Sequence, residues 1–187
     1  MSRFAAALLV LAVAPTTLAA QIGVIGGYNR DSFDRFSNED FALAESTNGF
    51  NTGIFLDFEF GQIGIRPGIT YRLLKGAIIQ QPDGQTANLE IVEIPIDVRV
   101  VAPLPFIKPY LLAGPTVIFP SSARPLADQA LAGARLGFGI GVGAEWDIGF
   151  RLWPEIRYGT SIGGIVEDDE TGGSRLDTFI ARLGISF

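Results

Sequence analysis

The last nine residues of the chain, Phe179-Ile-Ala-Arg-Leu-Gly-Ile-Ser-Phe187, alternate between two kinds of side chain. One face is wholly apolar, whereas the other carries mostly small or polar residues, among them Arg182, Gly184 and Ser186. Successive side chains of a β-strand point to opposite sides of the backbone, so a period of two predicts a strand with one apolar face. The same period recurs upstream of this stretch.

Eight segments of the chain have this strand-like alternation, and the connections between them alternate in length. We predict strands at about 21–28, 49–60, 63–73, 88–100, 106–119, 135–146, 150–160 and 179–187. The long connections are 29–48, 74–87, 120–134 and 161–174, and the short ones are 61–62, 101–105 and 147–149. The alternation in 106–119 is weak and leaves the facing of that strand open.

This pattern predicts an all-β fold, an eight-stranded antiparallel up-and-down transmembrane β-barrel with short periplasmic turns and long extracellular loops. An even number of strands lets 179–187 pair with 21–28, so that no unpaired edge remains in a bilayer. Both ends of the barrel domain then lie on the side of the short turns.

Composition suits one exported domain. The chain has 187 residues, of which 48% are hydrophobic, and its 23 glycines are spread through the alternating segments. It has no cysteine and no histidine, and acidic residues outnumber basic ones, 20 to 14. This balance offers no basic surface for nucleic acid. No stretch approaches the roughly 18 consecutive apolar residues that a transmembrane helix needs.

Residues 1–20 have the layout of a cleaved export signal, followed by a barrel domain at 21–187. Arg3 supplies a positive charge, residues 4–14 are apolar, and small residues precede Gln21. The apolar run is too short to span a bilayer as a helix. Cleavage after Ala20 is the preferred interpretation, with Ala19 as the alternative. The mature domain then has 13 basic and 20 acidic residues, a net charge of −7.

The charged residues of the strands share one face with the glycines, and the opposite face is almost purely apolar. Twelve of them form the predicted interior charge network: Asp57, Glu59, Arg66, Arg72, Glu93, Asp97, Arg99, Glu145, Arg151, Glu155, Arg157 and Arg182. Six are acidic and six are basic, as expected of a buried network. The apolar set is too bulky for the inside of an eight-stranded barrel, so we place it against lipid.

Aromatic residues gather near the strand ends, as in the interfacial girdles of membrane barrels. The predicted girdles comprise Tyr28, Phe50, Tyr71 and Tyr158 toward the long loops, and Phe58, Phe60, Trp146, Phe150 and Phe187 near the short turns.

The short turns also predict which charges meet. A two-residue turn at 61–62 places Asp57 across from Arg66, and a three-residue turn at 147–149 places Glu145 across from Arg151. Arg182 is expected near Glu155 and Arg157 of the preceding strand.

The chain resembles the small outer-membrane β-barrel family that includes the OmpA transmembrane domain and OmpX-like proteins, often described as a porin family. The resemblance covers residues 21–187 and rests on the architecture, on Lys108-Pro-Tyr-Leu-Leu-Ala-Gly-Pro115 and on the terminal strand. It implies the outer membrane of a Gram-negative cell envelope. It also implies that the barrel-assembly machinery reads the last strand, whose matching residues are Phe179, Leu183, Ile185 and Phe187.

Function is less determined than fold. The preferred interpretation is a structural or surface-interaction protein whose interior is plugged by the charge network and whose polar, acidic loops meet an extracellular ligand. A narrow passive pore is the alternative. We also considered a carrier of small apolar ligands and a soluble exported barrel. A calcium site at the acidic run 167–170 would need additional backbone carbonyls.

An enzyme is not expected, because the chain lacks the histidine on which outer-membrane acyltransferases and deacylases depend. No cofactor or metal is expected either. The chain is expected to be a monomer in outer-membrane lipid.

Overall fold

The computed structural model describes residues 20–34, 41–80, 84–122, 131, 133–165 and 174–186. The predicted signal, apart from Ala20, lies outside these residues, as do Phe187 and the acidic run 167–170. The strands of the described residues are β1 (Ala20–Phe33), β2 (Phe41–Leu43), β3 (Ser46–Phe60), β4 (Ile63–Gln80), β5 (Thr86–Val101), β6 (Ile107–Ser122), β7 (Arg135–Asp147), β8 (Arg151–Ile162) and β9 (Leu176–Ser186).

Nothing in the described part of the chain forms a helix long and apolar enough to cross a membrane.

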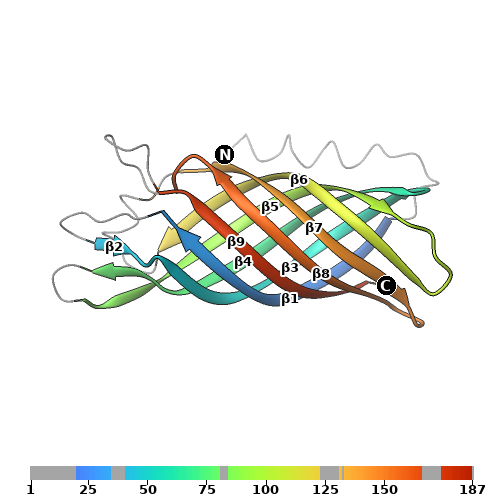
Figure 1. Cartoon of the computed structure of the whole chain (residues 1–187), viewed down its shortest axis with the longest axis horizontal. Coiled ribbons are helices and arrows are strands. Elements are labelled where there is room, and N and C mark those ends of the chain that lie inside the picture. The colour runs from blue at the N-terminus through green and yellow to red at the C-terminus, as the bar shows by residue number, and fades with distance from the viewer. Residues whose placement is uncertain are drawn as a thin grey trace, which may run out of the picture.

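Eight of these strands form a closed antiparallel barrel of tilted strands (Figure 1). Each barrel strand pairs with its neighbours in the chain, and β1 pairs with β9 from Gly23↔Ser186 to Phe33↔Leu176. The predicted eight-stranded barrel, and the pairing of its first and last strands, are therefore confirmed. The short β2 is an additional strand that pairs with the end of β4.

The strand registers show how steeply the strands are staggered. A path of paired residues that starts at Arg30 of β1 passes through Phe179, Tyr158, Ile140, Ala113, Val98, Ile65 and Phe58. It returns to β1 at Ala20, ten residues from its start. Strand number and stagger together determine barrel width, and eight strands enclose a space that side chains can fill.

The connection predicted at 74–87 is wrong in length, because β4 and β5 extend as a hairpin whose loop is 81–85. A register shift between Leu74 and Ile78 interrupts the alternation there, next to Gly76, whose φ is +63°. Ala77 and Ile78 are adjacent in the chain and are both buried, so the strict period of two ends at this irregularity although the strand continues. β1, β6 and β9 also extend further toward the loops than predicted.

Two of the short turns are displaced by one residue from their predicted positions. The turn at 61–62 is confirmed, but the other two comprise 102–106 and 148–150. Phe150, predicted as the first residue of a strand, therefore lies in a turn, and so does Phe106.

The barrel wall separates an apolar outside from an interior with two zones. Near the loops, the interior contains an apolar cluster of Phe33, Leu43, Leu74, Ala77, Ile78, Ala87, Leu89, Ile91, Ile118, Ile165 and Leu176. The rest of the interior holds the charged side chains and a smaller cluster of Ile25, Phe55, Tyr110, Leu112 and Trp153. Strand β6, whose facing the sequence left open, turns Tyr110, Leu112 and Thr116 inward.

Candidate functional site: the charged interior of the barrel

All twelve residues of the interior charge network lie on the inner face of the wall, and most are fully buried. Asp57, Arg72 and Arg99 are 0% exposed, and Asp97 and Glu145 are 1% exposed. The side chains of Glu59 and Arg151 are 28% and 25% exposed, because they lie near the end of the barrel that carries the short turns. Side-chain alternation along the strands turns the twelve network residues inward, since the residues next to them in each strand are mostly apolar and face outward.

Arg99 on β5 is the centre of the cluster at the turn end. Its Nη2 contacts Asp57 Oδ2 at 2.5 Å and Glu59 Oε1 at 2.7 Å, and its Nη1 contacts Glu145 Oε2 at 3.2 Å. Lys108 donates to Glu145 Oε1 at 3.1 Å. These contacts join residues from four strands, so the cluster ties distant parts of the wall together.

The predicted pairing of Glu145 with Arg151 is wrong in register. Asp147 is the residue across from Arg151, because the turn comprises 148–150 rather than 147–149. Arg151 Nη1 nevertheless reaches Glu145 Oε1 diagonally, at 3.3 Å, and Asp147 Oδ2 lies 3.8 Å from its Nε.

Glu155 on β8 is the acceptor at the middle of the barrel. Arg66 Nη1 donates to its Oε2 at 2.9 Å, Tyr110 donates to the same atom at 2.9 Å, and Arg182 donates to its Oε1. The predicted proximity of Arg182 to Glu155 is confirmed. So is the pair across the first turn, since Arg66 Nε lies 3.5 Å from Asp57 Oδ1.

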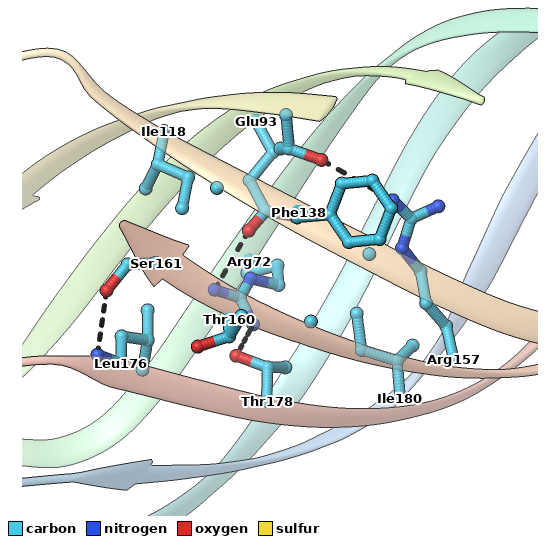
Figure 2. Close-up of a pocket in the computed structure, with 14 residues that line it drawn as sticks. Arg72, Glu93, Ile118, Phe138, Arg157, Thr160, Ser161, Leu176, Thr178 and Ile180 are labelled. Atoms are coloured by element: carbon cyan, nitrogen blue, oxygen red, sulfur yellow. Dashed lines mark hydrogen bonds and ion pairs between the residues drawn. The ribbon is translucent and has the colours of Figure 1, made fainter. Parts of the chain in front are cut away.

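Arg72 on β4 organises the cluster nearest the loops, with Thr178 below it in the close-up (Figure 2). Its Nη1 contacts Asp31 Oδ1 and Thr178 Oγ1, each at 2.7 Å, and its Nη2 contacts Glu93 Oε1 at 3.0 Å. Arg157 lies further along the same space and pairs with Asp97. Each cation therefore has at least one carboxylate.

Aromatic rings cover two of the buried guanidinium groups. Arg66 Cζ lies 4.4 Å from the centre of the Trp153 ring and 4.8 Å from that of Phe55. Arg99 Cζ lies 4.6 Å from the centre of the same Trp153 ring. Trp153 also donates its indole N–H to Ser186 Oγ at 2.8 Å, which fixes the ring. Cation–π attraction of this kind partly replaces the lost hydration of a buried arginine.

The interior also includes participants that the sequence did not single out, among them Asp31, Lys108, Tyr110 and Trp153. Asp31 was assigned to a loop, although the inward positions of β1 continue through Ile25 and Asn29 to Asp31. Lys108 and Tyr110 lie on the strand whose weak alternation hid its facing. Trp153 alternates in phase with Arg151 and Glu155 and so shares their inward face, but the sequence does not indicate that it stacks on arginine. Counting the period of two past Tyr28 would have identified Asp31.

Side chains fill the interior almost completely. One cavity lined by the network, next to Arg72, Thr116 and Ser161, measures about 20 Å³. A second, beside Arg66 and Arg182, measures about 10 Å³. One water molecule needs about 10–15 Å³ of such space. The glycines of β7 provide the room for the network, because a Cβ at Gly139 would overlap the Arg157 guanidinium, and one at Gly143 the Tyr110 ring.

The predicted girdle residues that the structure describes, all but Phe187, lie on the outer surface or in the turns. Tyr28, Phe50, Phe60, Trp146 and Tyr158 are each about half exposed, at 47%, 56%, 52%, 47% and 47%. Tyr71 and Phe150 are 37% and 39% exposed, and Phe58 is half-buried. Phe179 and Leu183 of the predicted assembly signal also face outward, at 49% and 48%, and Ile185 is half-buried. Their role in assembly stays a prediction.

The charges of the interior are matched in this arrangement. Each carboxylate of the network is held by an arginine or lysine, and in the described residues no group of histidine, cysteine, aspartate and glutamate could hold a metal ion. Carboxylates neutralised in this way hold strands together through the interior.

A solved structure shows the same fold, and two further solved chains are similar to this one. Neisserial surface protein A has a TM-score of 0.59 and 15% identity, with 90% of this chain and 99% of that chain covered. Ail of Yersinia pestis, solved with a heparin analogue, has a TM-score of 0.48 and 13% identity, covering 90% and 99% of the two chains. The barrel domain of Pseudomonas aeruginosa OprF has a TM-score of 0.39 and 11% identity, covering 89% and 97%. At these identities the likeness concerns the fold alone.

No sequence match was found among curated proteins. A family model described as the outer membrane protein beta-barrel domain, however, matches residues 4–187, nearly the whole chain. The match agrees with the closed eight-stranded barrel, its apolar outer surface and its charged interior, and it indicates the bacterial outer membrane as the location. The chain belongs to the outer membrane protein beta-barrel domain family.

Proposed function

We propose that this protein is a closed, non-conducting barrel with a structural or surface-interaction role in the outer membrane. The barrel anchors and orients the connections at its loop end, and these connections meet extracellular partners. The observation that carries the proposal is the filled interior, which leaves the loop end as the part of the molecule available to a ligand.

Two successive barriers support a closed barrel. Near the loops, Leu74, Ile78 and Leu89 belong to an apolar cluster that is almost fully buried inside the wall. Below it, the ion pairs of Arg72, Arg157, Arg66 and Arg99 follow one another toward the turn end. An ion crossing this space would have to displace paired charges and then enter an apolar region, where its desolvation is unfavourable.

A column of glycines such as that on β7 could leave room for a pore, but here it supports the closed barrel. The space beside Gly139 is occupied by Arg157, and that beside Gly143 by Tyr110. An enzyme is likewise disfavoured, because the buried carboxylates are engaged in ion pairs and the chain has neither histidine nor cysteine to act as base or nucleophile.

Planar-bilayer recording tests the proposal directly. Refolded protein, inserted at a level checked by heat-modifiable gel migration, should give no stepwise conductance at neutral pH. A general porin reconstituted in the same bilayer supplies the control for sensitivity. Reproducible steps that scale with the amount of inserted protein would establish the narrow-pore alternative and reject the closed barrel.

A further inference from the structure

Four strands of the barrel carry a proline at a point where their pairing with a neighbouring strand is interrupted. Between β4 and β5, pairing stops at residues 68–69 and 94–95 and resumes beyond them in the same register. Pro95 lies in this gap. Equal gaps of two residue pairs occur between β3 and β4, β5 and β6, and β7 and β8, and they contain Pro67, Pro115 and Pro154. Proline has no amide hydrogen, so each gap is what one absent donor leaves in an otherwise regular ladder.

The gap at Pro95 deprives one backbone carbonyl of its partner in the ladder. In the register of β4 and β5, Gly68 lies across from Pro95. An amide at position 95 would donate to the Gly68 carbonyl, and proline cannot. On the outer face the neighbouring Ile69 and Ile94 are 49% and 37% exposed, so this side of the wall is apolar. Lipid offers no hydrogen-bond donor, so the partner of this carbonyl has to come from the interior.

A small cavity lies at this point on the inner side of the wall. Its volume is about 10 Å³, which is room for one water molecule, and its lining includes Arg66, Gly68, Thr70, Pro95 and Asp97. Two of these side chains have polar atoms without a hydrogen-bond partner among the described residues, Arg66 Nη2 and Asp97 Oδ1. Arg66 is 3% exposed and Asp97 is 1% exposed. Other atoms of both side chains are held in ion pairs, which fix the unpartnered atoms beside the cavity.

We propose that this cavity binds one water molecule, which bridges Arg66 Nη2, Asp97 Oδ1 and the Gly68 carbonyl. The water accepts from the guanidinium and donates its two hydrogens to the carboxylate and the carbonyl, so one donor and two acceptors are satisfied together. About three hydrogen bonds are typical of a buried water. The bridge takes the place of the ladder bond that Pro95 cannot make, and it joins β4 to β5 from the inside. The proposal is independent of whether the barrel conducts or what its loops bind.

Cross-relaxation between water and amide hydrogens, measured by NMR on the refolded, isotope-labelled protein in detergent micelles, tests this site. Cross-peaks with the sign of a long-lived bound water should appear at the amides of Gly68, Thr70 and Asp97. The amides of Leu111 and Val142, which pair in the unbroken ladder of β6 with β7, should give none. Thr70→Val removes the hydroxyl from the lining, and the cross-peaks at Gly68 and Asp97 should persist because they come from water rather than from an exchanging hydroxyl.

Filling the cavity tests its location. Gly68→Ala places a methyl group on the inner face and should abolish the water cross-peak at Asp97, whereas Gly26→Ala, outside the cavity lining, should keep it. The new methyl group would lie 2.9 Å from the Ile54 carbonyl oxygen, so heat-modifiable migration checks that the variant folds. If it does not fold, the spectra of the wild type and of Thr70→Val decide. Absence of the cross-peaks in the wild type, or their persistence in folded Gly68→Ala, would overturn the proposal. Their loss in Thr70→Val would assign the hydroxyl of that residue as the partner of the carbonyl instead.

Discussion

At the scale of single residues, Arg99 shows how the interior depends on matched charge. Its side chain is fully buried and contacts three carboxylates, those of Asp57, Glu59 and Glu145. Exchanging a buried ion pair for apolar residues can be neutral, but removing one partner leaves uncompensated charge in a medium of low dielectric. The folded barrel then loses stability because the remaining carboxylates repel one another and stay buried without a counter-charge.

Replacing Arg99 by methionine should therefore destabilise the folded barrel by about 3–5 kcal/mol. Unfolding in urea, followed by tryptophan fluorescence in detergent micelles, measures the change. Arg175→Met is the control, because Arg175 forms an exposed pair with Asp177 and its loss should change stability by at most about 1 kcal/mol. A similar, small loss in both variants would show that the buried cluster contributes little.

At the scale of the strand, the seam between β1 and β9 closes the wall and depends on close backbone contact. Gly27 lies across from Arg182, and a Cβ there would overlap the Ala181 carbonyl oxygen and approach Arg182 Cα to 2.6 Å. The adjacent Gly26 has more room, since its nearest neighbour would be the Asn51 carbonyl oxygen at 3.8 Å. Two neighbouring glycines on one strand thus have different roles.

Gly27→Ala should impair barrel closure, whereas Gly26→Ala should be tolerated. Forcing a methyl group against backbone costs about 1–3 kcal/mol, because the two strands must separate. The fraction of protein with heat-modifiable gel migration, after refolding into detergent, gives the measure. Equal folded fractions for Gly27→Ala and Gly26→Ala would show that close backbone contact at Gly27 does not limit the pairing of β1 with β9.

The last strand also carries the predicted assembly signal. Deleting Phe187 should lower the amount of protein in the outer membrane, because the assembly machinery is expected to read the terminal aromatic residue. The stability of truncated protein refolded in detergent should stay close to that of the wild type, since the pairing of β1 with β9 ends at Ser186 and does not include Phe187. Normal outer-membrane levels of the truncated protein in fractionated cells would count against this role.

At the scale of the whole molecule, the strands and their connections extend further at one end of the barrel than at the other, and the two ends differ in chemistry. The strands extend past the charged zone on the loop side, where the β4–β5 hairpin and β2 lie together at one end of the barrel (Figure 1). On the other side, the short turns follow directly from the apolar outer surface. This asymmetry predicts that the loop end faces the medium and the turn end the periplasm.

Single cysteines test this orientation, because the chain has none of its own. In intact cells, a membrane-impermeant maleimide should label Thr86→Cys, at the start of β5 near the hairpin tip. Gln62→Cys, in the first short turn, should be labelled only after the cells are broken. Both native side chains are exposed, so accessibility in the folded protein is matched. Labelling of Gln62→Cys in intact cells would reverse the assigned orientation.

The sequence by itself determined the barrel class, the number of its wall strands and the inward facing of the twelve network charges. Side-chain alternation with a period of two is a local property, and it survives wherever a strand is regular. The pair of Asp57 and Arg66 followed from it because a two-residue turn leaves a single register across the hairpin.

Only the tertiary structure decided which charges meet across the barrel and where the apolar cluster lies. Glu155 binds Arg66 through a contact between strands that are not neighbours, and no local pattern encodes such a distance. The extension of β4 past Leu74 was hidden because an irregularity interrupts the side-chain alternation there. Asp31 was missed for a different reason. Its polar neighbours suggested a loop, whereas closure of the wall buries its carboxylate beside Arg72.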